Sequence, residues 1–358
     1  MDTSKNLHPQ FKFNGLTFES SQDLVDFGNK LKKNGALYER QIAKFILKWF
    51  DDNDYIKVKT SGSTGKPKKI RLLKEHMVNS ASATGVFFKM GAGNTALLCL
   101  PAKYIAGKMM LVRALTMGWD LHVVAPEKDA ITHYDNTYDF AAMVPYQVYH
   151  SIDALDKIKK LIIGGGAVSN ELDALLQNKK TEAFATYGMT ESVTHIAVRR
   201  INGAGKTSSY SAMPDVTFKT DSRGCLVIDA FKVSEKPIIT NDLVTINSAR
   251  SFEWLGRIDN VVNSGGVKLF PEQIEKKIGS QIDVPFVISS EKDDALGERL
   301  ILVLETTDKF ALKNHPEIFN TLDAFERPKK IYTMSKLPIT ENGKIRRGEI
   351  QKLLKGYR

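Results

Sequence analysis

One stretch rich in hydroxyl side chains, glycine and lysine gives the first indication of the fold: Thr60-Ser61-Gly62-Ser63-Thr64-Gly65-Lys66-Pro67-Lys68-Lys69. Glycines let such a loop bend through positive φ and bring backbone N–H groups close to a ligand, while hydroxyls and lysines add donors and charge. The loop therefore suits a polyphosphate. It is not a Walker-type loop, because Lys66 is followed by Pro67 and the first glycine stands too close. Composition alone leaves a solvated turn as an equal alternative.

Three further motifs follow this stretch along the chain. They are Tyr187-Gly188-Met189-Thr190-Glu191, the pair Gly256–Asp259 and Ser264–Glu275, and Leu337–Arg347. In this order, the four motifs resemble the signatures of the adenylate-forming superfamily, which holds acyl-CoA synthetases, luciferases and peptide-synthetase adenylation domains. The resemblance extends from Thr60 to the end of the chain.

Length and composition agree with a globular protein of one large domain and one smaller domain. The chain has 358 residues, of which 42% are hydrophobic and 26% charged. No apolar run approaches the roughly eighteen residues of a membrane span, and the polar N-terminus lacks a signal core. Cys99 and Cys225 stand far apart, with neither a disulfide framework nor a zinc spacing, so we expect a cytoplasmic protein.

The net charge of +10 raises the alternative of nucleic-acid binding. The basic residues are scattered, however, and two of their clusters lie inside the motifs. ATP and coenzyme A are polyanions, so attraction of anionic substrates accounts for the sign. We therefore expect small-molecule partners and no nucleic acid. Nothing in the sequence indicates an oligomeric state.

Periodicity predicts alternating strands and helices in the first half of the chain. Apolar spacing indicates helices over 37–51, 74–88 and 108–117, and short apolar runs indicate strands over 56–59, 96–100, 120–124, 140–144 and 160–163. Such alternation implies parallel strands between helix layers. From Arg199 onward, strands over 215–220, 225–230 and 243–247 alternate with turns, which is typical of an antiparallel region.

The resemblance implies an α/β adenylate-forming fold with two domains. Residues 1–257 would form a large N-terminal core with the ATP and acyl sites, and residues 258–358 a small, mobile α+β domain. Only fifty-nine residues precede Thr60, fewer than the family usually has. We therefore expect a trimmed N-terminal subdomain, whose sheet order stays open.

The resemblance also implies a nucleotide site. The residues expected to cradle the β- and γ-phosphates are Thr60, Ser61, Gly62, Ser63, Thr64, Gly65 and Lys66. Tyr187, against the adenine, and Gly188 belong to the same site. The segment Gly164-Gly165-Gly166-Ala167 resembles the adenine pocket; as a dinucleotide fingerprint it lacks the third glycine.

Ribose contacts are expected from Asp242 and Arg257. Asp242 stands in Thr240-Asn241-Asp242, where the family has Thr-Gly-Asp, and Arg257 would contact the ribose or a phosphate. Asn241 replaces the usual glycine, and asparagine tolerates a left-handed φ, so the turn can survive.

The resemblance further implies catalytic roles for three residues. Thr190 would bond the α-phosphate and Glu191 would hold Mg²⁺, since a hard cation prefers carboxylate oxygen. Lys344 would bridge the carboxylate and α-phosphate oxygens. Outside these motifs, Glu191 would be read as a surface carboxylate and Lys344 as an exposed lysine of a basic tail.

Domain rotation is implied by the same resemblance. Asp259 matches the hinge about which the small domain turns between adenylation and thioester formation. After rotation, Gly265 and Gly266 would line the tunnel for the pantetheine thiol of coenzyme A.

The acyl pocket is expected around Leu100–Gly107, with Lys103, Tyr104 and His195 as substrate-lining residues. Relatives commonly place an aromatic residue and a histidine where this chain has Lys103-Tyr104. A lysine in an apolar pocket is costly unless paired, which suggests a second negative charge on the acid. This context is similar to o-succinylbenzoate–CoA ligases of menaquinone biosynthesis.

Two alternatives remain open. The chain could be another aryl- or acyl-CoA ligase, or a stand-alone adenylating enzyme that loads a carrier protein. It could also be a non-catalytic nucleotide-binding module, against which the intact Lys344, Glu191 and phosphate loop argue.

Overall fold

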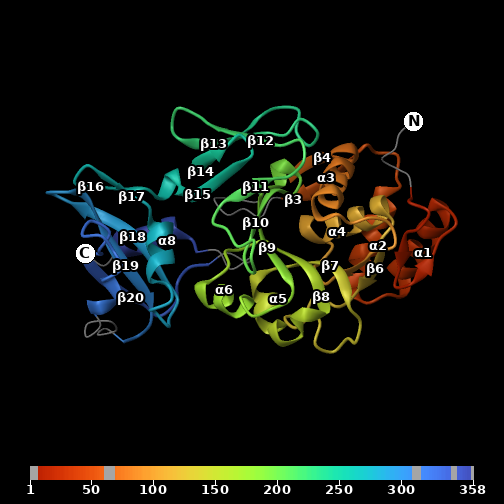
Figure 1. Cartoon of the computed structure of the whole chain (residues 1–358), viewed down its shortest axis with the longest axis horizontal. Coiled ribbons are helices and arrows are strands. Elements are labelled where there is room, and N and C mark those ends of the chain that lie inside the picture. The colour runs from red at the N-terminus through yellow and green to blue at the C-terminus, as the bar shows by residue number, and fades with distance from the viewer. Residues whose placement is uncertain (1–6, 60–68, 309–315, 340–344, 356–358) are drawn as a thin grey trace.

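The structure is a computed structural model that describes residues 7–59, 69–308, 316–339 and 345–355. One sheet of thirteen strands forms its centre, in the order β12-β13-β14-β15-β11-β10-β9-β8-β7-β5-β6-β1-β2. Figure 1 shows the C-terminal strands at one end of the molecule and the N-terminal helices at the other. Within the described residues, no helix is long and apolar enough to cross a membrane.

Half of the large sheet is parallel, as the alternation of strands and helices predicted. All five strand pairings within this half are parallel. The strands are β1 (Lys12–Phe13), β6 (Asp120–Val123), β5 (Thr95–Leu98), β7 (Tyr138–Met143), β8 (Ile158–Ile163) and β9 (Glu182–Gly188). A short antiparallel strand, β2 (Leu16–Thr17), ends this side of the sheet.

Successive residues of these strands enter two different cores. Phe140 and Ala142 of β7 pack with the N-terminal helices, whereas Ala141 and Met143 pack on the opposite face. Because side chains alternate across a strand, the sheet is covered on both sides, as parallel sheets generally are.

Six helices cover the two faces. On one side, α2, α3 and α4 contribute to the larger core, and α1 packs against α2; on the other, α5 and α6 close the second core. Their bounds are α1 (Ser21–Asn34), α2 (Leu37–Trp49), α3 (Lys74–Phe88), α4 (Ile105–Met117), α5 (Pro145–His150) and α6 (Asn170–Leu176). The helices expected over 37–51, 74–88 and 108–117 are thus confirmed, with α3 matching its predicted bounds.

The region after Arg199 is antiparallel, as predicted, but it is not a separate sheet. Its strands extend the same sheet beyond β9, because β10 pairs with β9 in antiparallel register. The strands are β10 (His195–Arg200), β11 (Tyr210–Ala212), β15 (Ser251–Arg257), β14 (Ile238–Ser248), β13 (Cys225–Asp229) and β12 (Thr217–Thr220).

A separate hairpin of β3 (Tyr55–Lys59) and β4 (Lys69–Leu73) flanks the glycine-rich stretch. Ile56, Val58 and Leu72 bury one face of this hairpin against the larger core. The stretch 60–68 itself lies outside the described residues.

The C-terminal part has its own sheet and its own cores. Two buried clusters contain only residues from Val262 onward, and the two larger cores end at Phe252. The elements are β16 (Val262–Ser264), β17 (Val267–Leu269), β18 (Phe286–Asp293), β19 (Gly297–Glu305), β20 (Lys330–Met334), α7 (Pro271–Ile278) and α8 (Arg347–Lys355).

Polar contacts join the two parts at their junction. Gln273 of α7 donates from Nε2 to the carbonyl oxygens of Trp254 (3.0 Å) and Leu255 (2.9 Å) at the end of β15. Asn170 at the start of α6 donates to the carbonyl oxygen of Lys276 at 2.8 Å. The small part is therefore held by backbone carbonyls on both sides of the junction.

Candidate active site

Tyr187 and Asp242 are brought together although 55 positions separate them along the chain. The hydroxyl of Tyr187, near the end of β9, donates to Oδ2 of Asp242 at 2.6 Å. Burial raises the pKa of Tyr187, as do the charge of Asp242 and their hydrogen bond, so the phenol stays protonated and acts as a donor. The ring packs edge-on against Phe252 and Tyr210, which fixes its orientation.

A chain of polar contacts continues from Asp242 to the segment in which Asp259 is expected to be the hinge. Asp242 Oδ1 accepts from Trp254 Nε1 at 3.2 Å and lies 3.9 Å from Nη1 of Arg257. Nη2 of Arg257 in turn reaches Oδ2 of Asp259 at 2.8 Å, in the 3₁₀ turn η4 (Ile258–Asn260). The residues expected at the ribose and at the hinge are thus one connected cluster at the domain junction.

The loop expected at the adenine lies beside this cluster. Gly165, Gly166 and Ala167 are exposed after β8, next to β9. Thr186 of β9 donates to the carbonyl oxygen of Ile163 at 3.1 Å, which holds the start of the loop against the strand that carries Tyr187. The structure therefore brings the loop and Tyr187 to the same edge.

Thr190 and Glu191 lie in the 3₁₀ turn η3 (Thr190–Ser192), directly after β9. The Glu191 side chain is exposed. Mg²⁺ is commonly held by one or two carboxylates together with substrate phosphates, so a single exposed carboxylate at this turn fits the cation.

Val193, the residue after this turn, has a strained backbone conformation. Its φ of 66° and ψ of −60° form a γ-turn closed by a 2.7 Å bond from Thr194 N to the carbonyl oxygen of Ser192. A positive φ is unusual for a buried β-branched residue and costs roughly 1–3 kcal/mol. The turn sends the chain back so that His195 pairs with Gly188 across β9 and β10.

Gly188 permits this close return. A Cβ at this position would collide with the carbonyl oxygen of Thr194. His195 is consequently placed directly opposite the residue that precedes the Met189–Glu191 motif.

Arg113 lies behind His195 and is the most unusual group in the site. Its guanidinium donates from Nε to Thr84 Oγ1 at 3.2 Å, from Nη2 to His195 Nδ1 at 3.3 Å and from Nη1 to Met110 Sδ at 3.6 Å. The residue is 1% exposed, and none of these partners carries a negative charge. An unpaired buried ion costs several kcal/mol, so this cation is expensive for the fold. Burial lowers the pKa of Arg113 to about 9, which leaves it charged at neutral pH.

His195 is held neutral by this neighbour. Arginine can only donate, so Nδ1 of His195 accepts, and Nε2 carries the proton toward Thr84 Oγ1 at 3.4 Å. Burial, and then the charge of Arg113, keep the pKa of His195 well below its usual value. The imidazole is therefore neutral, is held in one orientation by two hydrogen bonds, and is a poor proton acceptor.

Lys103 and Tyr104 lie on the surface, away from Arg113 and His195. Both are exposed on the loop before α4, and the ammonium of Lys103 sits 4.8 Å from the centre of the Tyr104 ring. The expectation that Lys103 lies in an apolar pocket is therefore wrong: its charge is solvated and needs no partner. Arg113 stands nine positions after Tyr104, about 13 Å further along the helix axis.

Lys108 stabilises that loop. Its ammonium donates to the carbonyl oxygens of Ala102 (2.7 Å) and Lys103 (2.6 Å), and burial lowers its pKa to about 8.

The remaining expected residues are in the C-terminal part or outside the described chain. Gly265 and Gly266 form the exposed two-residue turn of the β16–β17 hairpin, with φ of 58° and 84°, a combination that glycine adopts without strain. Lys344 and the phosphate-loop residues Thr60, Ser61, Gly62, Ser63, Thr64, Gly65 and Lys66 lie outside the described residues.

Sequence reasoning missed Arg113, Thr84 and Trp254. Arg113 did carry a signal, because it interrupts the apolar run Met109–Leu115 of a helix that would otherwise be buried on all sides. A lone cation in such a run has to be either paired or functional.

The chain is similar in sequence and in fold to known proteins. The family model of AMP-binding enzymes matches residues 42–221. A probable 2-succinylbenzoate–CoA ligase of Mycobacterium tuberculosis strain H37Rv is 26% identical over 338 residues, covering 86% of each chain.

Two solved structures are also similar. An acyl-CoA synthetase (AMP-forming)/AMP-acid ligase II-like protein from Dyadobacter fermentans is 35% identical with a TM-score of 0.62, covering 92% of this chain and 98% of that one. The o-succinylbenzoate coenzyme A synthetase of Bacillus subtilis, in complex with ATP and magnesium, has a TM-score of 0.70 at 19% identity, covering 83% and 69%. These matches confirm the adenylate-forming fold expected from the motifs.

Proposed function

Because this chain belongs to the AMP-binding enzyme family, we propose that it ligates a carboxylic acid to coenzyme A, with o-succinylbenzoate as the acid. In the first step, the acid's carboxylate oxygen attacks the α-phosphorus of ATP, and the bond to pyrophosphate breaks. In the second step, the coenzyme A thiol attacks the carbonyl carbon of the acyl-adenylate and AMP leaves. The thiol proton is released to solvent.

The buried charge of Arg113 is the observation that carries the choice of acid. The fold keeps this guanidinium out of water, and its three bonded partners in the described structure are neutral. A second carboxylate on the substrate would supply the missing negative charge. Because His195 lies between them, the guanidinium would act on that carboxylate by charge attraction through the poorly solvated interior and not by a direct hydrogen bond. We therefore assign the role first expected of Lys103 to Arg113, with His195 between it and the ligand.

The nucleotide would lie along the cluster at the domain junction. Asp242 would accept from the ribose hydroxyls, Tyr187 and the loop Gly165–Ala167 would contact the adenine, and Arg257 would reach the ribose or α-phosphate. Thr190 would bond the α-phosphate, and Thr60–Lys66 the outer phosphates. Mg²⁺ held by Glu191 would neutralise phosphate charge during the attack.

We propose that residues 1–257 form the adenylation core and residues 258–358 the mobile domain. The separation of hydrophobic cores between Phe252 and Val262 supports this boundary. Asp259, whose carboxylate bonds to Arg257 across it, would be the hinge. Lys344 would enter the site for adenylation, and rotation would bring Gly265 and Gly266 to the thiol tunnel.

Support for the substrate also comes from the relatives, of which several carry the name 2-succinylbenzoate–CoA ligase. A place in cytoplasmic menaquinone biosynthesis follows from that assignment. Another aryl-CoA ligase, or an adenylating enzyme that loads a carrier protein, remains the second candidate.

The test is pyrophosphate release with a panel of acids, in the presence and absence of coenzyme A. We expect release with o-succinylbenzoate and MgATP, and formation of the coenzyme A thioester by mass spectrometry. Adenylation without thioester formation would favour a carrier-protein loader. ATP binding without pyrophosphate release for any acid would identify a non-catalytic module.

A further inference from the structure

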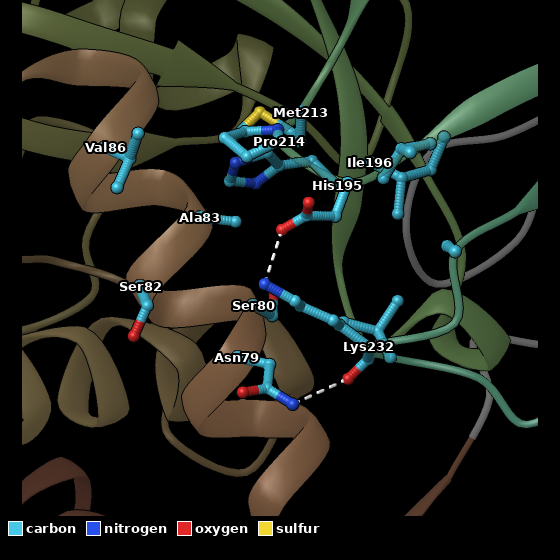
Figure 2. Close-up of a pocket in the computed structure, with 14 residues that line it drawn as sticks. Asn79, Ser80, Ser82, Ala83, Val86, His195, Ile196, Met213, Pro214 and Lys232 are labelled. Carbon is cyan, nitrogen blue, oxygen red and sulfur yellow. Dashed lines mark hydrogen bonds and ion pairs between the residues drawn. The ribbon is translucent and has the colours of Figure 1, made fainter.

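A cavity of about 130 Å³ lies between α3 and the start of β10. Figure 2 shows Asn79, Ser80, Ala83 and Val86 of α3 along one wall, with His195 opposite. Its mouth lies at Lys232 and Asp215, whose side chains are about half exposed, whereas its inner end is closed by the buried side chains of Ser80 and His195. The cavity therefore leads from solvent to the imidazole that Arg113 supports.

The nucleotide cluster takes no part in this cavity. Tyr187, Asp242 and Arg257 do not line it; the opposite wall comes from His195 and Ile196 and from the segments 213–216 and 230–233. Because Gly188 pairs with His195, the inner end of the cavity lies next to the strand that carries the nucleotide motif.

An ion pair crosses the outer end. Lys232 Nζ lies 2.7 Å from Asp215 Oδ2, and both side chains are about half exposed. The backbone of Lys232 is tied to α3, because Asn79 Nδ2 donates to its carbonyl oxygen at 2.9 Å (Figure 2). Lys232 is thus held at the mouth by one backbone contact and one exchangeable carboxylate.

Lys232 and Arg113 differ in whether a carboxylate lies beside them. Lys232 at the mouth already has the partner Asp215, and a pair so exposed is worth about 1 kcal/mol or less. Arg113 does not line the cavity but lies behind His195 at its inner end, and it bonds only to uncharged groups in the described structure. An anionic ligand can therefore replace Asp215 at little cost and gains more by moving inward.

We infer that this cavity is the entrance and binding channel for the carboxylic acid substrate, with Lys232 as its first anion contact and Asp215 as the competing carboxylate. The inference rests on the proposed function, which supplies the acid. A separate entrance would let the acid reach the site while the nucleotide occupies the junction side of β9.

The test compares two substitutions that are expected to change the KM for the acid in opposite directions. Lys232→Gln removes the attracting charge, and Asp215→Asn frees it; asparagine also tolerates the φ of 59° at position 215. We expect Lys232→Gln to raise KM for o-succinylbenzoate about three- to tenfold and Asp215→Asn to lower it, with kcat and the KM for ATP unchanged. The acid benzoylpropionate, which lacks the ring carboxylate, should respond less.

A matched control removes the same charges from an ion pair away from the cavity. Lys206 Nζ and Asp173 Oδ1 form such a pair at 2.6 Å, and Lys206→Gln and Asp173→Asn should leave the acid's KM unchanged. Equal effects at the two pairs, or no effect at Lys232 and Asp215, would overturn the channel.

A third variant tests the path itself. Ala83→Phe should fill the cavity and reduce kcat/KM for the acid at least tenfold, while equilibrium binding of MgATP persists. Undiminished kcat/KM in a folded Ala83→Phe protein would exclude this route. A wild-type protein that binds MgATP but adenylates no acid would instead contradict the proposed function, and the channel with it.

Discussion

Arg113 and His195, 82 positions apart in the sequence, are joined at 3.3 Å between Nη2 and Nδ1 in the interior of the protein. The contact fixes the tautomer of the imidazole and places behind it a positive charge that has no acidic partner among the described residues. A fold gains nothing in stability from burying a cation without a counter-ion, so its presence here points to a ligand.

Substituting Arg113 should reduce activity without reducing the stability of the fold. We expect Arg113→Met to lower kcat/KM for o-succinylbenzoate on the order of tenfold to a hundredfold, because the positive charge behind His195 no longer attracts the second carboxylate. The thermal midpoint should stay unchanged or rise, because the desolvation cost disappears. Benzoylpropionate kinetics and thermal unfolding check both halves.

Lys103→Met is the matched control, since it removes one cation from an exposed position next to the same helix. It should change kcat/KM less than about threefold. If Arg113→Met reduces kcat/KM equally for both acids, Arg113 does not recognise the second carboxylate.

The pH dependence of stability should report on His195. Its pKa is lower in the folded state than in the unfolded chain, so its contribution is complete above the unfolded value of about 6.5 and is lost as the pH falls below it. Between pH 7.5 and 5.5, we expect wild type to lose more unfolding free energy than His195→Gln does, by at most about 1.4 kcal/mol, the limit set by the unfolded pKa. Urea denaturation at both pH values measures this. His133→Gln, at an exposed histidine, should behave as wild type does.

The hydroxyl of Tyr187 and the charge of Asp242 should contribute unequally to ATP binding. Asp242→Asn should raise KM for ATP about tenfold or more, since the ribose hydroxyls lose a charged acceptor. Tyr187→Phe keeps the ring and removes only one bond to Asp242, so a two- to tenfold rise is expected. Tyr210→Phe, in the same aromatic cluster, should have little effect. A larger loss from Tyr210→Phe than from Asp242→Asn would remove Asp242 from the ribose site.

Lys344→Ala should abolish adenylation and largely spare the second half-reaction. The motif around this lysine implies a role in bridging the carboxylate and the α-phosphate. Supplying pre-formed acyl-adenylate and coenzyme A isolates the second step, and Lys352→Ala on α8 controls for loss of a nearby cation. Equal loss of both half-reactions would contradict this division of roles.

Asp259→Pro should slow the passage between the two half-reactions more than nucleotide binding, because proline fixes φ where the hinge must turn. Asp259→Ala removes the same carboxylate from Arg257 but leaves φ free, so it separates the two effects. Timing adenylation and thioester formation separately provides the measurement. An unchanged ratio of the two rates in Asp259→Pro would place the hinge elsewhere.

The secondary structure of the N-terminal part followed from local patterns. The bounds of α3, the apolar face of α2 and the alternation of β5, β7 and β8 with helices were predictable, because periodicity and turn chemistry act over a few residues. The order of the four motifs was sufficient to predict the adenylate-forming fold and to name Tyr187, Asp242 and Arg257. That these three meet was implied by the family resemblance and not by their spacing.

The sequence by itself therefore determined the class of fold, most of its elements and the identity of the nucleotide residues, since these depend on short-range patterns and motifs. Only the tertiary structure decided that the antiparallel strands extend the parallel sheet through the β9–β10 pairing. It also placed Lys103 in solvent and Arg113 in the interior. Burial and charge pairing depend on which distant segments pack together. The residues that flank a lysine or an arginine in the sequence therefore do not reveal whether its side chain is buried or exposed.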